Sequence, residues 1–225
     1  MPTRKKKVIK GETKNYNTVI RFEISDSWDI QDFASFYNSI DVLYRHDYCV
    51  HELNSLLRYL QEFELIAYDK QPAIESYLYF IPNLIRTLIN LDKFSFEFIQ
   101  DSREVRFGLF APFPFKPNDT FFDYQPLLVT RTQHSSPGFT DLLGISGLLK
   151  EIRELIQYYL PNREGKEKVE LIRQQRISMQ IDNYKKIGLS DTEIQKILLQ
   201  EQKSIDITKK LISEGKILDA HLVDE

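Results

Sequence analysis

The spacing of hydrophobic residues changes along the chain, and these changes limit the fold more than any other feature. In TVIRFEI, residues 18–24, hydrophobic side chains alternate with Arg21 and Glu23, as expected for a β-strand with one buried face. From 33 to 44 the hydrophobic residues instead recur at helical spacing, and Asp29 is a candidate N-cap for this helix. Because strand-like alternation returns later, the sequence predicts an α+β fold, with a small, mostly antiparallel sheet packed against amphipathic helices.

The same two periods place the remaining elements of the main domain. Residues 53–63 continue the helical spacing, either as an extension of the first helix or as a second one. The segment 73–91 favours helix with Pro82 as a kink or boundary, and a strand near 75–81 is the alternative. FSFEFIQ (94–100) and EVRFGLF (104–110) are predicted to form an antiparallel hairpin. PLLVTRTQ (126–133) is a further strand candidate.

The composition changes after Pro161, where a long helical pattern ends. Residues 163–218 lack Phe, Trp, Pro and Cys. Within them Ser190 and Glu193 form a candidate capping box, and Gly188 and Gly215 are candidate helix stops. We therefore expect three parts: a disordered basic arm (1–15), the α+β domain (16–161) and a helical C-terminal extension (162–225).

The stretch HSSPGFTDLLG, residues 134–144, groups serine, histidine and glycine residues and raises the question of a reactive site. A nucleophilic serine on a strand-to-helix elbow usually has glycine on both sides, and that frame is absent here. Exposed amides at Gly138 could offer a modest anion site. The prediction that explains most residues is a turn made by Pro137 and Gly138, with Thr140 or Asp141 capping a helix that starts at 141.

No other motif predicts catalysis or a cofactor. His46, Asp47, Cys49 and His51 are close in sequence, but on a helix only the first and third share a face, and no second ligand pair exists in the chain. Phosphate-loop, dinucleotide-binding and zinc-protease motifs are also absent from the sequence. We therefore expect no enzyme activity, no metal site and no cofactor.

Charge and cysteine content narrow the partners and the compartment. The net charge is −3 and the pI is near 5.9, so contact with nucleic acid would need a local basic patch. The one concentrated run of such residues is at the start of the chain: Arg4, Lys5, Lys6, Lys7 and Lys10. A single cysteine indicates a reducing compartment, and no apolar stretch is long enough to span a membrane, so a cytoplasmic protein is expected.

The C-terminal helices predict the function, because their apolar stripe is sparse for a buried helix. We expect these helices to dock on a protein partner or on a second copy of the chain. The predicted partner-binding residues are Ile172, Met179, Tyr184, Ile187, Ile194, Ile197 and Leu198. The alternative is a nucleic-acid-binding accessory protein that uses the N-terminal run together with Arg173, Arg176, Lys185 and Lys186.

Two stretches also carry a resemblance. VIRFEISDSWDIQDFASFYNSIDVLY and LLVTRTQHSSPGFTDLLGISGLLKEIRELI, about a quarter of the chain, resemble uncharacterised bacterial α+β proteins with an S-P-G turn and a helical tail. The order of elements is also similar to adaptor modules of the TRADD N-terminal type in bacterial conflict systems. This resemblance implies a non-enzymatic adaptor within a multi-component antiviral defence system.

Overall fold

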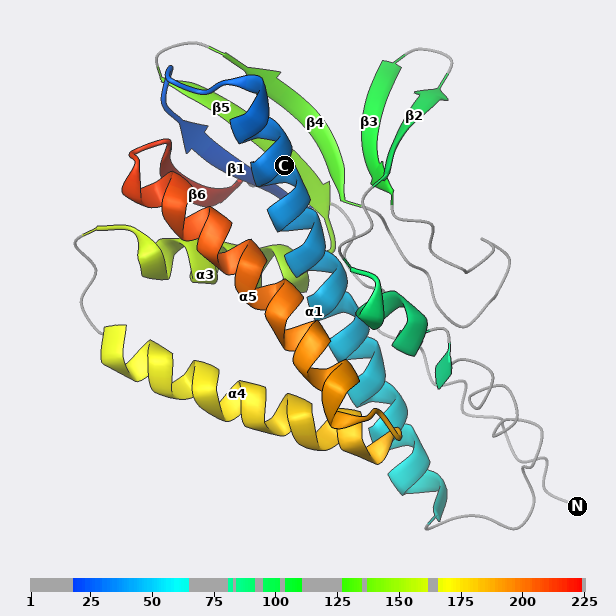
Figure 1. Cartoon of the computed structure of the whole chain (residues 1–225). Coiled ribbons are helices and arrows are strands. Elements are labelled where there is room, and N and C mark those ends of the chain that lie inside the picture. The colour runs from blue at the N-terminus through cyan, green and yellow to red at the C-terminus, as the bar shows by residue number, and fades with distance from the viewer. Residues whose placement is uncertain are drawn as a thin grey trace, which may run out of the picture.

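The strands form one antiparallel sheet with the order β2-β3-β4-β5-β1-β6 (Figure 1). The computed structural model describes residues 18–64, 81–82, 84–91, 95–101, 104–110, 127–134, 137–161 and 166–223. The six strands are β1 (Thr18–Ile24), β2 (Ser95–Asp101), β3 (Glu104–Phe110), β4 (Leu128–Gln133), β5 (Gly138–Gly144) and β6 (Ile217–Val223). The predicted α+β class is confirmed, as are the predicted hairpin and the strands near 18–24 and 126–133.

Helices cover one face of this sheet and extend well beyond it (Figure 1). The long helices α1 and α5 pack side by side, and α3 lies against β1 and β6. α4 precedes α5 in the chain, and a short turn joins its C-terminal end to the start of α5. Their bounds are α1 (Ile30–Glu64), α3 (Ser146–Tyr159), α4 (Lys166–Lys186) and α5 (Asp191–Ser213). Residues 81–82 and 84–89 are also helical, as predicted for part of 73–91; residues 73–80 lie outside the described part.

The apolar segments at 33–44 and 53–63 belong to one helix. α1 runs for 35 residues and contains neither glycine nor proline, so nothing in its backbone chemistry interrupts it. Its start is capped reciprocally: the amide of Asp32 donates to Asp29 Oδ1 at 2.8 Å, and the amide of Asp29 donates to Asp32 Oδ2 at 2.9 Å. The predicted cap at Asp29 is therefore present.

The alternation of β1 sets which side of the sheet carries the core. Ile20, Phe22 and Ile24 are fully buried against the helices. The ring of Phe22 meets the ring of Phe36 edge-on at 4.9 Å, which joins β1 to α1. Arg21 points to the other side of the sheet, where its guanidinium donates two 2.7 Å hydrogen bonds to Asp141 of β5. β1 thus places apolar side chains on the helix side of the sheet and an ion-paired arginine on the other.

The prediction of a helix starting at Asp141 was wrong, because residues 138–144 form the strand β5 instead. β5 lies between β1 and β4 and pairs with both, so tertiary pairing outweighs the helical spacing that Leu142 shares with later residues. α3 begins only at Ser146. The residue before it, Ile145, caps α3 without a side-chain hydrogen bond, and its amide donates to the buried Tyr44 hydroxyl at 3.0 Å.

The C-terminal segment contains the predicted helices, but it also completes the sheet and the core. β6 pairs antiparallel with β1, and the sequence analysis predicted no strand there. Side chains of α5, among them Ile205 and Leu211, belong to the same hydrophobic cluster as Ile20 and Phe22. Residues 162–225 are therefore not an appendage on a finished domain, since β1 gains its outer neighbour from them.

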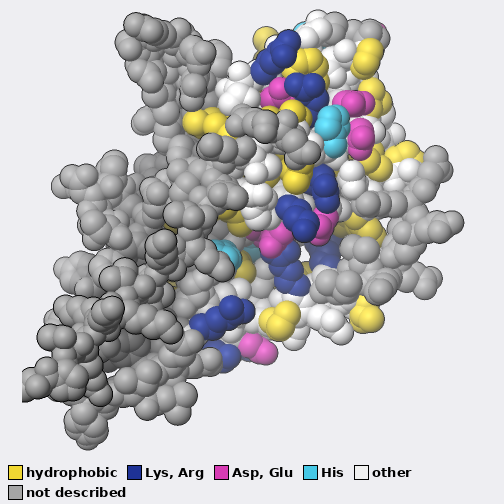
Figure 2. Space-filling view, turned by 180° about the vertical axis from the view of Figure 1, so that it is seen from behind, with side chains coloured by type: hydrophobic (Ala, Val, Ile, Leu, Met, Phe, Trp, Pro, Cys, Tyr) yellow, Lys and Arg dark blue, Asp and Glu magenta, His cyan; other side chains and the backbone are white. Residues whose placement is uncertain are grey.

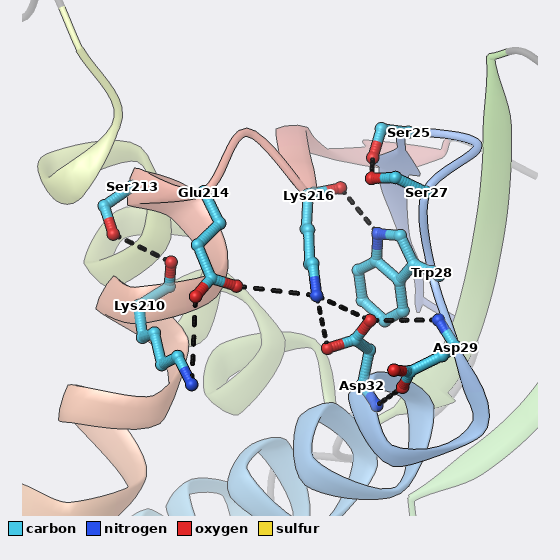
Figure 3. A network of polar contacts seen from close by, with 9 residues as sticks. All are labelled: Ser25, Ser27, Trp28, Asp29, Asp32, Lys210, Ser213, Glu214 and Lys216. Atoms are coloured by element: carbon cyan, nitrogen blue, oxygen red, sulfur yellow. Dashed lines mark hydrogen bonds and ion pairs between the residues drawn. The ribbon is translucent and has the colours of Figure 1, made fainter.

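A polar network connects the turn between α5 and β6 to the start of α1 (Figure 3). The indole Nε1 of Trp28 donates to the backbone oxygen of Lys216 at 2.8 Å. The Lys216 ammonium lies 2.6 Å from Asp32 Oδ1 and 3.5 Å from Glu214. These contacts hold the turn between α5 and β6 against the first turn of α1. The two residues of the indole bond, Trp28 and Lys216, are 188 positions apart in the sequence.

Candidate functional site

The predicted partner-binding residues divide into buried and exposed groups. Tyr184, Ile194 and Ile197 are at most 4% exposed and belong to the chain's own core. Their assignment as partner-binding residues is corrected, because the side chains already pack inside the protein. Ile187 and Leu198 are half-buried against that core. Met179 is exposed; Ile172 lies in α4, and its side chain is outside the described part.

α4 docks on the body of the protein through polar side chains as well as through Tyr184 and Ile181, which pack in or against the core. Arg176 reaches Asp47 of α1 and Glu151 of α3, with distances of 3.1 and 2.5 Å from its Nη2. Asn183 Nδ2 donates to Asn54 Oδ1 of α1 at 2.7 Å. Each contact comes from the face of α4 that points inward, so the helix places its polar residues toward the protein.

Two large apolar side chains of α4 are exposed to solvent, and one of them, Met179, lies at the edge of the docked face. Leu171 is 56% exposed and Met179 is 61% exposed, and the exposed Gln175 lies midway between them. These three residues, spaced at i, i+4 and i+8, form what we call the α4 stripe. Since neighbours in such a series differ by about 40° around a helix, the stripe occupies one side of α4.

A polar cleft of about 480 Å³, which we call the chamber, lies between α1, α3 and α4 and is open to solvent on one side. Besides Asp47, Glu151 and Arg176, its lining includes cationic, amide and apolar side chains. These are Val50, His51, Asn54, Leu57, Arg58, Met179, Gln180, Asn183 and Lys186. The sequence analysis missed this chamber because it searched α4 for an apolar stripe; the signal was the polar series Arg176, Gln180 and Asn183 at helical spacing.

The carboxylates of the chamber share a single guanidinium. Burial and the nearby charge of Asp47 raise the pKa of Glu151, and together they exceed the opposing effect of Arg176. Two carboxylates and one guanidinium leave this end of the chamber with excess negative charge. Arg58 and Lys186, by contrast, make no ion pair within the part of the chain that the structure describes.

His46 lies behind the chamber, fully buried in α1. Its Nε2 is 3.1 Å from the Tyr184 hydroxyl and 3.7 Å from Glu201. Burial opposes protonation of the ring, but the carboxylates of Glu201 and Asp47 outweigh burial, so the pKa of His46 is raised. Burial also raises the pKa of the Cys49 thiol, which therefore stays protonated and is a poor nucleophile at neutral pH.

The four residues considered as a metal cluster do not converge on one point, although His46 Nδ1 lies 3.5 Å from Asp47 Oδ1. Among the described residues, no group of three or more His, Cys, Asp or Glu side chains is placed to hold a metal ion. His46 and Cys49 are buried, whereas His51 is exposed and turns toward the chamber. Within the same described ranges, no helix combines the length and apolar content needed to cross a bilayer.

The S-P-G stretch leads into the strand β5 and not into a helix. Ser135 and Ser136 lie outside the described residues, and His134 is exposed with its ring 6.0 Å from that of Phe33. The hydroxyl of Thr140, expected as a cap, instead lies 2.9 Å from that of Tyr37. The predicted capping role of Thr140 and Asp141 was therefore wrong.

Two of the four cations named for the nucleic-acid alternative point inward. Arg176 is held as described above, and Arg173 donates to the Tyr159 hydroxyl and to Gln202. Lys185 is exposed and 3.4 Å from Asp191. Across the described residues visible in Figure 2, Lys and Arg side chains are interspersed with Asp and Glu. The N-terminal run Arg4, Lys5, Lys6, Lys7 and Lys10 lies outside the described part.

The comparisons with known proteins add no relative to these observations. The exposed side chains of Leu171 and Met179 on α4, together with the polar contacts of this helix to α1 and α3, are therefore the main guide to function. Searches against protein-family models, curated proteins and solved structures find no match to this chain.

Proposed function

We propose that the chain is a non-catalytic protein-interaction subunit that self-associates through the α4 stripe. The observation that carries this proposal is the orientation of α4, which turns Leu171 and Met179 to solvent while burying Gln180. A helix with this orientation leaves apolar surface that burial against another protein would stabilise. The exposed charged residues Asp182 and Lys186 lie on the same side of α4, beyond Met179, so they would be at the rim of the contact.

A second copy of the chain fits this stripe by symmetry. Leu171 and Met179 are equally distant from Gln175, about 6 Å along the helix axis on either side. If two α4 helices meet antiparallel with a two-fold axis at Gln175, Leu171 of each copy faces Met179 of the other. This is an isologous contact, the commonest kind in homodimers. Packing one i, i+4 row against another also gives a common helix crossing angle of about 50°.

The expected association is weak. Four large side chains, two from each copy, would be buried, and complete burial stabilises by about 1.5–3 kcal/mol per side chain. Loss of translational and rotational freedom opposes this gain by an estimated 4–15 kcal/mol. The most favourable combination of these values leaves about 8 kcal/mol, so the dissociation constant should be no tighter than micromolar, which suits a reversible adaptor.

The resemblance to bacterial adaptor modules points the same way. A TRADD N-terminal type module acts by bringing other proteins together, and reversible self-association would allow this chain to do so within a defence system. In that role, the local concentration of copies would control assembly, because a weak dimer forms only when the copies are brought together.

Light scattering after size exclusion tests the proposal over a range of protein concentrations. With rising concentration, the average mass of the full chain should increase from 26.6 kDa toward twice that value. The double variant Leu171→Glu with Met179→Glu should remain monomeric. Leu199→Glu is the matched control, because Leu199 is 56% exposed on α5 and outside the stripe. A wild-type chain that stays monomeric at the highest concentration would contradict self-association, as would equal loss of the dimer in the control.

A further inference from the structure

The chamber between α1, α3 and α4 has the size and the chemistry of a ligand site. Its volume of about 480 Å³ lies inside the roughly 300–1,000 Å³ range of small-molecule pockets. Val50, Leu57 and Met179 supply apolar wall, and amide and charged groups supply the polar remainder. Only three of the twelve lining residues are apolar, so the chamber suits a polar or charged organic molecule better than an apolar one.

The strongest indication is Gln180, which lines the chamber from α4. The residue is 4% exposed, and its side-chain oxygen makes no hydrogen bond to any described residue. Buried polar atoms in native proteins nearly always have a partner, and a buried acceptor without one is destabilising. A hydrogen-bond donor carried by a ligand would satisfy it.

The charges around the chamber give the second requirement. Arg58 and Lys186 line it, come from different helices, and form no ion pair with the rest of the described chain. The imidazole of His51 belongs to the same lining. A guanidinium and an ammonium at one site favour an acidic group, because a carboxylate or phosphate can accept hydrogen bonds from both.

We propose that the chamber binds a small organic anion whose acidic group meets Arg58 and Lys186 and whose hydroxyl or amino group donates to Gln180. Either a phosphorylated sugar or an amino acid carries this combination of groups. The proposal and self-association share Met179, but Gln180, Arg58 and Lys186, which would hold the ligand, are outside the α4 stripe. Binding and oligomeric state can therefore fail separately.

Isothermal titration calorimetry on the full chain tests the proposal with three defined probes. Ribose 5-phosphate represents the phosphorylated sugars, L-glutamate represents the amino acids, and D-ribose is the neutral control. We expect saturable binding of one of the two anions and no binding of D-ribose. If neither anion binds at millimolar concentration, or if D-ribose binds as tightly as ribose 5-phosphate, the proposal is wrong.

Variants assign the binding to this chamber. Gln180→Leu should weaken binding about tenfold or more, since it removes a buried acceptor, and Arg58→Gln or Lys186→Gln should weaken it as well. Gln174→Leu and Lys196→Gln are the matched controls, because both residues are exposed and outside the lining. Binding that survives the chamber changes, or that the controls weaken equally, would overturn the assignment.

A purely structural role for Gln180 makes a different prediction for the same variant. Because the Gln180 oxygen has no partner, leucine of similar size should leave the urea midpoint unchanged or raise it. Loss of binding together with an unchanged or higher midpoint supports the ligand site. A lowered midpoint would mean that Gln180 stabilises the fold, and the proposal would then be overturned.

Discussion

Replacing Ile197 by alanine tests whether α5 is part of the core. Ile197 is 0% exposed and belongs to the same hydrophobic cluster as the β1 side chains. The change removes three buried carbons, so the transfer contribution is about 2.4 kcal/mol at about 0.8 kcal/mol per carbon. The cavity left behind adds to this, and we expect a total near 3–4 kcal/mol, inside the usual range of about 2–5.

Leu199 provides a control on the same helix, two residues away. Its side chain is 56% exposed, so Leu199→Ala should change the free energy of unfolding by no more than about 0.5 kcal/mol. The two variants differ in burial while sharing the helix, the side-chain size and the replacement. Any general effect of alanine on α5 is therefore common to both.

The assay is urea unfolding followed by the fluorescence of Trp28, the single tryptophan of the chain. Trp28 is 6% exposed, packs on Phe33 and Phe36 and donates to the Lys216 backbone, so its signal reports the contact between α1 and the C-terminal segment. Equal midpoints for Ile197→Ala and Leu199→Ala would refute the assignment of α5 to the core.

The remaining predictions concern buried polar groups, one close contact and one helix cap. Arg45→Met leaves Asp41 buried without the guanidinium that bonds it at 2.8 Å, so urea unfolding should show a loss of about 3–5 kcal/mol, most of it recovered by adding Asp41→Leu. Burial raises the pKa of Asp41 from 3.8 to about 6, so protonation of this carboxyl favours the folded state. The free energy of unfolding should therefore fall as pH rises from 4 through 6, and the double variant Asp41→Leu with Arg45→Met should lose this pH dependence. Gly144→Ala places a Cβ 3.0 Å from the buried Tyr44 ring, and calorimetry should show a lower Tm for a loss of about 1–3 kcal/mol. Ser190→Ala removes the capping box of α5 and should cost about 1 kcal/mol, seen as faster amide exchange in the first turn of that helix.

Local signals in the sequence predicted the elements that local chemistry determines. The capping box of Ser190 and Glu193 is formed, with the Ser190 side chain accepting from the Glu193 amide. Gly188 and Gly215 follow their helices with φ of 86° and 68°, the left-handed region that glycine adopts without strain. Each of these features depends on residues within a few positions of one another, so spacing alone was enough to predict them.

Elements that depend on distant partners were missed. β6 is stable because it pairs with β1, whose residues are almost two hundred positions earlier in the chain. β5 was predicted as helix because Leu142 and Ile145 are three residues apart, yet its backbone pairs with strands on both sides. Strand pairing of this kind is not visible in the periodicity of one segment.

The candidate site was predicted only in part, and for a similar reason. The sequence correctly marked Met179 as unsatisfied by the core, but it could not separate Met179 from Tyr184, which is buried beside His46. The chamber needs residues of three helices, and its polar side chains carry no motif. A search of each predicted helix for polar as well as apolar stripes would have found the inward face of α4.

Deletion of the C-terminal segment is a poor test of assembly. Deleting residues 162–225 would remove β6 and the buried face of α5, so a change in oligomeric state after truncation would report unfolding as much as lost contacts. Single substitutions on the exposed face of α4 leave the core intact. They isolate the surface that the proposed self-association uses.

Cysteine cross-linking at position 175 tests self-association through the α4 stripe most directly. Helices in contact lie about 8–10 Å apart, which brings the Cα atoms facing each other at a two-fold axis to about 3.4–5.4 Å, and the upper part of this range is within reach of a disulfide. Gln174 is also exposed but lies about 100° away around α4, and the native Cys49 is buried. Self-association predicts a covalent dimer from Gln175→Cys under mild oxidation and none from Gln174→Cys; equal cross-linking of both variants, or of neither, would contradict it.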